Sequence, residues 1–204
     1  MPRSPSKPDK KEKLRDELLG LLGSRPIALV GMMGAGKTTV GRRLASKLGR
    51  DFIDSDEEVE KAAGMSIEEI FSLHGESDFR SGEERVITRL LKQGGIVLGT
   101  GGGAFLNPQT REHIKALAVS VWIKADFELL FARVARRTNR PLLKTANPRE
   151  TLAKLIDQRY PIYAEADLAV VSRDIPQDQV ADEIMRELVK FLRKAPVATE
   201  LAHD

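Results

Sequence analysis

Gly31-Met32-Met33-Gly34-Ala35-Gly36-Lys37-Thr38 is the stretch of sequence that decides the fold class. It lies between the apolar run 27–30, which predicts a buried strand, and the amphipathic segment 37–48, which predicts a helix. A loop of the form G-x-x-x-x-G-K-[ST] in that context binds nucleotide phosphates, because its glycines let backbone N–H groups face the phosphate oxygens and the helix adds its positive end. The motif indicates ATP or GTP binding and leaves the phosphate acceptor open.

Each position of this loop has an expected role. Lys37 should reach the β- and γ-phosphates, and the Thr38 hydroxyl should ligate Mg²⁺. The residues that we expect to contact the nucleotide are Gly34, Ala35, Gly36, Lys37, Thr38 and Thr39.

Outward from the loop, short apolar runs alternate with helical segments. Continuous apolar strands separated by helices are typical of a parallel sheet with helices on both faces. We therefore predict an α/β fold with a parallel sheet between two helical layers and strands at 27–30, 52–53, 96–98, 119–123 and 168–171. The expected helices cover 37–48, 56–92 with turns at Gly64 and Gly75, 108–117, 127–137, 150–158 and 177–193.

The composition places this domain between two tails. The predicted organisation is a basic, partly disordered extension at 1–24, with disorder to residue 13 and a short helix around 14–22, then one domain at 25–193 and a tail at 194–204. The first 15 residues carry a net charge of +4 and the whole chain carries +3, so residues 16–204 carry a net charge of −1. That balance argues against a nucleic-acid partner. The absence of cysteine and of a long apolar run fits a cytoplasmic protein without a membrane segment.

Two carboxylates follow the strand at 52–53. Asp54 and Asp56 are two residues apart, so on an extended segment both would face one site at the carboxyl end of the sheet. One could serve the metal and the other a substrate hydroxyl. The alternative is a solvated helix N-terminus in an acidic run that continues with Glu57 and Glu58. The spacing alone does not choose between them.

Three arginines stand next to distinctive neighbours. Arg80 follows Phe79, Arg140 precedes Pro141, and Arg159 begins Arg159-Tyr160-Pro161-Ile162-Tyr163. Arginine suits bidentate recognition of carboxylate or phosphate, although any one of them alone would be interpreted as a surface charge.

The order of these motifs carries a resemblance. Phosphate loop, Asp-Ser-Asp, Phe-Arg-x-x-Glu, Thr-Gly-Gly-Gly, Arg-Pro-Leu-Leu and Arg-x-Pro-x-Tyr follow one another, and from about residue 26 to 192 the chain resembles the shikimate kinase family. The resemblance implies a P-loop three-layer α/β sandwich like the nucleoside monophosphate kinases. Its sheet would have five strands, and it would have substrate-binding and lid regions, with the lid at about 138–149. It also implies transfer of the γ-phosphate of ATP to the 3-hydroxyl of shikimate, with Mg²⁺, in aromatic amino acid biosynthesis.

The resemblance also assigns residues. Asp54 would hold a water of the Mg²⁺ ion, and Asp56 would bind substrate hydroxyls. Arg80, oriented by Glu83, and Arg159 would clamp the shikimate carboxylate next to Gly101, Gly102 and Gly103. Together with Lys37 and Asp56, Arg140 of the lid would complete the catalytic set by reaching the ATP phosphates. Arg137 would stack on adenine, with Arg136 as a rival, and the late adenine contact near 175–176 has no clear polar match.

Other interpretations remain beside this one. A gluconate kinase shares the loop and size but does not require the glycine triplet with both substrate arginines. A regulatory or nucleic-acid-dependent P-loop ATPase fits poorly with the near-neutral domain. We expect a monomer whose partner is the small-molecule substrate, with Trp122, Tyr160 and Tyr163 serving in packing.

Overall fold

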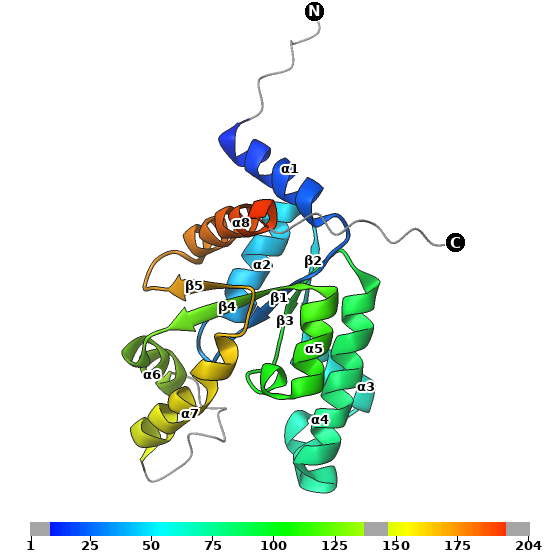
Figure 1. The fold of residues 1–204 in the computed structure, drawn as a ribbon. Coiled ribbons are helices and arrows are strands. Elements are labelled where there is room, and N and C mark those ends of the chain that lie inside the picture. Colours follow the sequence, from blue (N-terminus) through cyan, green and yellow to red (C-terminus); the bar gives the residue numbers. More distant parts are fainter. Residues whose placement is uncertain (1–8, 137–146, 195–204) are drawn as a thin grey trace, which may run out of the picture.

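A five-stranded parallel sheet forms the centre of the molecule (Figure 1). The computed structural model describes residues 9–136 and 147–194. The strands lie in the order β2-β3-β1-β4-β5, and all neighbouring pairs are parallel. Their bounds are β1 Ile27–Val30, β2 Asp51–Asp54, β3 Ile96–Gly99, β4 Val119–Ala125 and β5 Leu168–Ser172. The predicted parallel α/β sheet is therefore confirmed.

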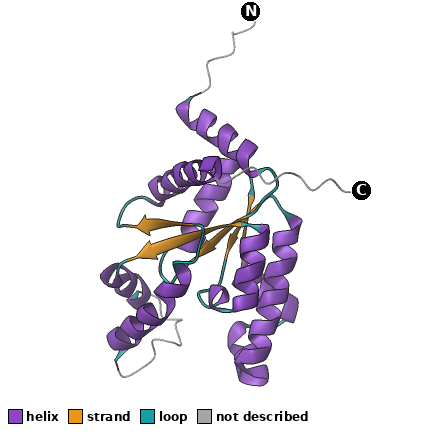
Figure 2. Ribbon diagram, viewed as in Figure 1, coloured by secondary structure: helices purple, strands orange, loops and turns teal. Residues whose placement is uncertain are grey.

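Helices cover both faces of the sheet, which gives the three layers visible in Figure 2. On one face α2 packs against α8, and α1 packs against α8. On the other face α4 packs on β3 and α5 on β4, with α6 and α7 beside them (Figure 1). The bounds are α1 Lys10–Leu22, α2 Lys37–Leu48, α3 Ser55–Ala63, α4 Ile67–Gln93, the 3₁₀ turn η1 Ala104–Leu106, α5 Pro108–Leu117, α6 Phe127–Ala135, α7 Pro148–Tyr163 and α8 Gln177–Lys194.

Local sequence signals set several of these helix ends. Ser66 and Glu69 form a capping box at the start of α4, and Asn107 caps α5 ahead of Pro108. Gly64 ends α3 in the left-handed region, and Gly75, with φ 79°, kinks α4 where a turn was predicted. None of the described helices is long and apolar enough to cross a lipid bilayer.

Helix α7 differs from its prediction. It was expected at 150–158, but it runs from Pro148 to Tyr163 and continues through Pro161. Tertiary contacts hold its last turns, because the Tyr160 hydroxyl donates to the Ala125 carbonyl and the Trp122 and Tyr160 rings meet edge to face at 5.0 Å. Trp122, 6% exposed, lies in the core as predicted.

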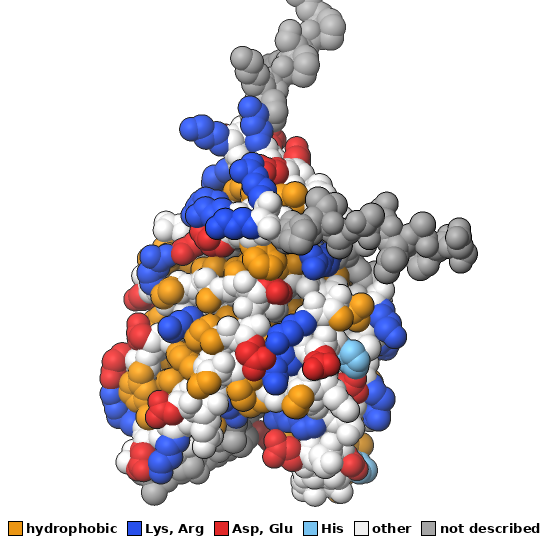
Figure 3. Space-filling model, viewed as in Figure 1, with side chains coloured by type: hydrophobic (Ala, Val, Ile, Leu, Met, Phe, Trp, Pro, Cys, Tyr) orange, Lys and Arg blue, Asp and Glu red, His pale blue; other side chains and the backbone are white. Residues whose placement is uncertain are grey.

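The N-terminal extension also differs from its prediction. Helix α1 begins at Lys10 rather than near residue 14, because Asp9 and Glu12 form a capping box. Leu18 is fully buried and Leu22 is 4% exposed, so both belong to the main core. Basic side chains gather around this helix at the top of Figure 3. From Lys10 onward the extension is therefore part of the folded unit.

Candidate active site

The phosphate loop follows β1 and passes into α2 at Lys37. Gly31, Gly34 and Gly36 have φ values of 137°, 81° and 101°, a region that L side chains rarely adopt. A Cβ at Gly31 would also come within 2.7 Å of the Ile123 carbonyl oxygen. The predicted dependence of this turn on glycine is therefore visible in its backbone.

Lys37 lies over the loop that it belongs to. Its Nζ donates to the carbonyl oxygens of Gly31 at 2.7 Å and Met32 at 3.0 Å. The ammonium is thereby held in front of the first turn of α2, whose N-cap, Gly36, has no side chain to occupy that space. This is where a phosphate would meet both the helix end and the lysine.

The side-chain oxygens of Asp54 and Thr38 lie next to each other beside the phosphate loop. Asp54 ends β2, and its Oδ2 accepts a hydrogen bond from Thr38 Oγ1 at 3.0 Å. Its Oδ1 accepts from the Asp56 backbone N–H at 3.1 Å and so caps α3. Asp54 is therefore a helix cap and a neighbour of the phosphate loop at once.

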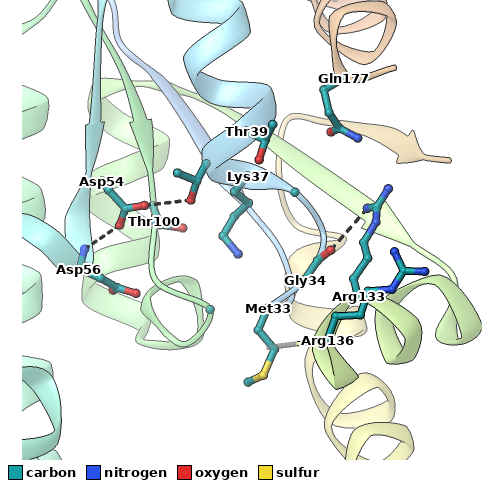
Figure 4. A pocket seen from close by; sticks show the side chains of 13 residues that line it. Met33, Gly34, Lys37, Thr39, Asp54, Asp56, Thr100, Arg133, Arg136 and Gln177 are labelled. Atoms are coloured by element: carbon teal, nitrogen blue, oxygen red, sulfur yellow. Dashed lines mark hydrogen bonds between the residues drawn. The ribbon is translucent and has the colours of Figure 1, made fainter. Parts of the chain in front are cut away.

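These groups line one cavity, shown from close by in Figure 4. Its volume is about 560 Å³, which suits a small-molecule site. Asp56 and Gly102 line it together with the loop. The other lining residues are Met33, Gly34, Gly36, Lys37, Thr38, Thr39, Asp54, Thr100, Arg133, Arg136 and Gln177.

Two residues of the glycine triplet are tightly enclosed. A Cβ at Gly101 would lie 2.4 Å from Asp56 Oδ1 and 2.7 Å from Glu83 Oε1. A Cβ at Gly103 would lie 2.4 Å from a terminal nitrogen of Arg80. At Gly102 the nearest atom would be 3.5 Å away, an ordinary contact. The glycines at 101 and 103 therefore allow side chains from two other elements to reach the end of β3.

Arg80 and Glu83 form an ion pair on α4. Arg80 Nη1 donates to Glu83 Oε2 at 2.7 Å, and the Glu83 side chain is only 2% exposed. Burial raises the pKa of Glu83, Arg80 opposes that shift, and the nearby Asp56 carboxylate adds to it. Among the described residues Glu83 Oε1 has no hydrogen-bond partner. Arg80 is thus oriented by a buried carboxylate, as the resemblance implied.

Arg159 reaches the same triplet from α7. Its Nη1 donates to the Gly102 carbonyl at 3.4 Å, and the buried Tyr163 hydroxyl donates to the same oxygen. Burial raises the pKa of Tyr163 to about 12, so this phenol remains a hydrogen-bond donor at neutral pH. Tyr163 packs as predicted, and it also fixes Gly102, a contact that the sequence did not indicate.

Arg133, on α6, was missed by the sequence interpretation. Its Nη1 donates to Ser172 Oγ at 2.9 Å and to the Gly34 and Ala35 carbonyls at 3.4 Å. Its Nη2 donates to the Arg173 carbonyl at 3.2 Å. It therefore links the phosphate loop to the end of β5 (Figure 4). All but one of the hydrogen-bond acceptors of Arg133 are backbone carbonyls in segments far away in the sequence. No local sequence motif therefore indicated a role for Arg133.

Two more residues line the cavity, and one of them is a predicted position. Arg136, the rival for the adenine contact, lines the cavity. Gln177, directly after the unassigned positions 175–176, lines it too, and its buried Oε1 has no partner among the described residues. Arg137 and Arg140 both lie outside the described residues, as does most of the expected lid.

Comparison with known proteins places this site in a family. A family model described as shikimate kinase matches residues 33–189. The chain belongs to the shikimate kinase family. The shikimate kinase of Rhodopseudomonas palustris is 53% identical over 180 residues, covering 88% of this chain and 89% of that protein. The shikimate kinase of Nitrobacter winogradskyi is 55% identical over 187 residues, covering 92% and 87%.

Solved structures agree. Shikimate kinase from Acinetobacter baumannii in complex with shikimate has a TM-score of 0.80 at 38% identity, covering 88% of this chain and 99% of that one. A gluconokinase from Sinorhizobium meliloti has a TM-score of 0.52 at 21% identity, which shows a shared fold alone. As a member of the shikimate kinase family, this chain is an ATP-dependent kinase with a P-loop fold.

Proposed function

We propose that this protein transfers the γ-phosphoryl group of ATP to the 3-hydroxyl of shikimate, giving 3-phosphoshikimate and ADP in the chorismate pathway. The observation that carries the proposal is the meeting of Arg80, Arg159 and Asp56 at the glycine triplet. The two guanidinium groups can bind a carboxylate of the substrate, and the Asp56 carboxylate can accept a hydrogen bond from a substrate hydroxyl. A polyhydroxylated carboxylic acid carries both of these groups. The phosphate loop lines one cavity together with Asp56 and Gly102.

The reaction requires positioning more than covalent help. Lys37 would exchange its loop carbonyls for the β- and γ-phosphate oxygens and offset the charge that develops during transfer. Asp56 would accept the hydrogen bond of the attacking hydroxyl and take up its proton. The new bond joins this oxygen to phosphorus as the bond from phosphorus to the ADP oxygen breaks.

The Thr38 hydroxyl and the Asp54 carboxylate, 3.0 Å apart, fit a Mg²⁺ ion that keeps most of its waters. Thr38 would ligate the ion directly and Asp54 would hold one of its waters. The ion would neutralise phosphate charge. No described cluster of three or more acidic, histidine or cysteine side chains could by itself hold a metal ion, which suits an ion delivered with ATP.

The lid arginine has a kinetic signature. The sequence Arg140-Pro141 predicts an extended conformation for the arginine, because a following proline disfavours the helical region. An arginine on a closing lid would contact ATP only in the reacting state. Arg140→Ala should therefore lower kcat far more than it weakens ATP binding. Steady-state kinetics with direct nucleotide binding checks this. A loss explained entirely by weaker ATP binding would remove Arg140 from the catalytic set.

One assay tests the whole proposal. ATP consumption by the purified protein should depend on shikimate and should not respond to gluconate or nucleic acid, and Lys37→Met should abolish it without unfolding the protein. Consumption driven by gluconate would favour the other small-metabolite kinase, and stimulation by nucleic acid would favour an ATPase. We further propose that nucleic acid is not a partner, because residues 16–204 carry a net charge of only −1. A cytoplasmic monomer without a membrane partner is part of the same proposal.

A further inference from the structure

A second cavity lies away from the phosphate loop, between α3 and α4. We call it the α3–α4 groove; its volume is about 490 Å³. Its apolar walls are Val59, Met65, Ile70, Phe79 and Val86, which belong to a small hydrophobic cluster. Val86 also packs against the main core. This size and lining suit a small molecule that buries an apolar group.

Two opposite charges stand on the α4 side of the groove. Asp78 and Arg85 both line it, both are exposed, and neither makes an ion pair or side-chain hydrogen bond within the described chain. They are seven residues apart, hence on one helix face, and helical side chains lean toward the N-terminus, so the long Arg85 leans toward Asp78. Arg89, also on the rim, is already paired with Glu58 at 3.2 Å.

Gly82 leaves space between these two charges. It lies on the same helix face, and a Cβ built there would meet no atom within 4 Å. Along this face of α4 the groove therefore has the Asp78 carboxylate, the open space at Gly82 and the Arg85 guanidinium, and apolar side chains lie beside them. A ligand that matches this pattern carries an ammonium and a carboxylate close together, with a large apolar group attached.

We infer that the α3–α4 groove binds a free α-amino acid with a large apolar side chain. The ammonium pairs with Asp78, the carboxylate pairs with Arg85, and the side chain packs on Met65, Ile70 and Phe79. Met65 and Phe79 favour an aromatic side chain in the ligand, because methionine sulfur and phenylalanine rings both make favourable contacts with aromatic rings.

The groove is connected to the active site through Phe79. The Arg80 guanidinium lies 5.0 Å from the centre of the Phe79 ring. Phe79 also lines the groove. If Arg80 binds the substrate carboxylate, which rests on the proposed function, an amino acid on Phe79 alters the shikimate KM and leaves the ATP KM unchanged. Linkage requires that shikimate change the affinity for the amino acid by the same factor.

Calorimetry on the full chain with L-phenylalanine tests the site without any turnover. Saturable one-to-one binding is expected, and 3-phenylpropionate and phenethylamine, which each lack one charge, should bind at least about tenfold more weakly. Arg85→Gln and Asp78→Asn should each weaken binding by about tenfold or more, and Gly82→Leu should abolish it by filling the floor. The exposed Lys92 and Glu68 of the same helix supply the matched controls Lys92→Gln and Glu68→Gln, which should bind normally.

Each result bears on the inference. Absence of saturable binding overturns it, as does binding that survives Gly82→Leu or that equals the binding of the two single-charge analogues. Shikimate-dependent ATP consumption, measured separately, keeps the tests apart. If that activity is absent while binding follows the predicted variants, the proposed function fails and the groove assignment stands. If the amino acid binds but leaves the shikimate KM unchanged, the connection through Phe79 is wrong.

Discussion

Gly101→Ala is the substitution that tests the packing of the substrate side most directly. Gly101 does not have a positive φ, so alanine adds no backbone strain there. Its Cβ would lie 2.4 Å from Asp56 Oδ1 and 2.7 Å from Glu83 Oε1, below the separation of real carbon–oxygen contacts. At least one carboxylate must move, and either movement removes a contact that the proposed reaction needs.

The size of the effect follows from what is displaced. Losing one hydrogen bond to a charged group costs about 1.5–3 kcal/mol, which corresponds to about a 10- to 150-fold fall in kcat/KM for shikimate. ATP binding should change little, because the phosphate loop is untouched. Steady-state kinetics with both substrates varied provides the measurement, and thermal unfolding confirms that the protein is folded.

The matched control is Gly20→Ala on α1. A Cβ at Gly20 meets no atom within 4 Å, and the helix contains none of the proposed ligands. This variant should keep full activity and gain slightly in stability, since alanine favours helix. A folded Gly101→Ala protein with unchanged kcat/KM would refute the reasoning, because the two carboxylates would then not need their present positions.

Three further predictions address other parts of the molecule. Asp54→Asn should mainly weaken the Mg²⁺ dependence and Asp56→Asn the use of shikimate; titration of each variant with metal and substrate checks this, and identical defects would contradict the division of roles. Arg80→Lys and Arg159→Lys should each raise the shikimate KM by about 10-fold or more, because an ammonium cannot reproduce the planar fork. Leu18→Ala should lower the free energy of unfolding by about 2–5 kcal/mol in a denaturant titration while activity at low temperature stays normal.

Two controls sharpen these experiments. A shikimate analogue that lacks the carboxylate should bind the unmutated enzyme poorly, and equal binding would argue against the arginine clamp. Leu21→Ala removes a leucine of the same helix that is 39% exposed, so its effect on stability should be much smaller than that of Leu18→Ala.

The sequence predicted most of the architecture because its signals were local. The phosphate loop fixed the first strand and helix, and the predicted sheet strands all formed with ends that moved by at most two residues. Helix α7 was expected to end at 158, whereas Tyr160 and Tyr163 anchor its last turns to Ala125 and Gly102 beyond Pro161. The start of α1 was signalled by Asp9 and Glu12, and the basic composition around them obscured it.

The site was predictable to a similar degree. Asp56, Arg80 and Arg159 carry recognisable neighbours in the sequence, and the structure brings all three to the glycine triplet. Arg133 and Gln177 have no such signature, because their positions depend on segments that meet only after the sheet has formed. Long-range contacts of this kind cannot be inferred from spacing along the chain.

The packing of α1 separates two boundaries that are easily confused. The family model begins to match at residue 33, yet the core includes Leu18 and the whole of β1 at 27–30. The segment that the family model matches is therefore shorter than the unit that folds. A chain trimmed to residues 33–189 would lose the central strand of the sheet and the helix α1 that packs against α8.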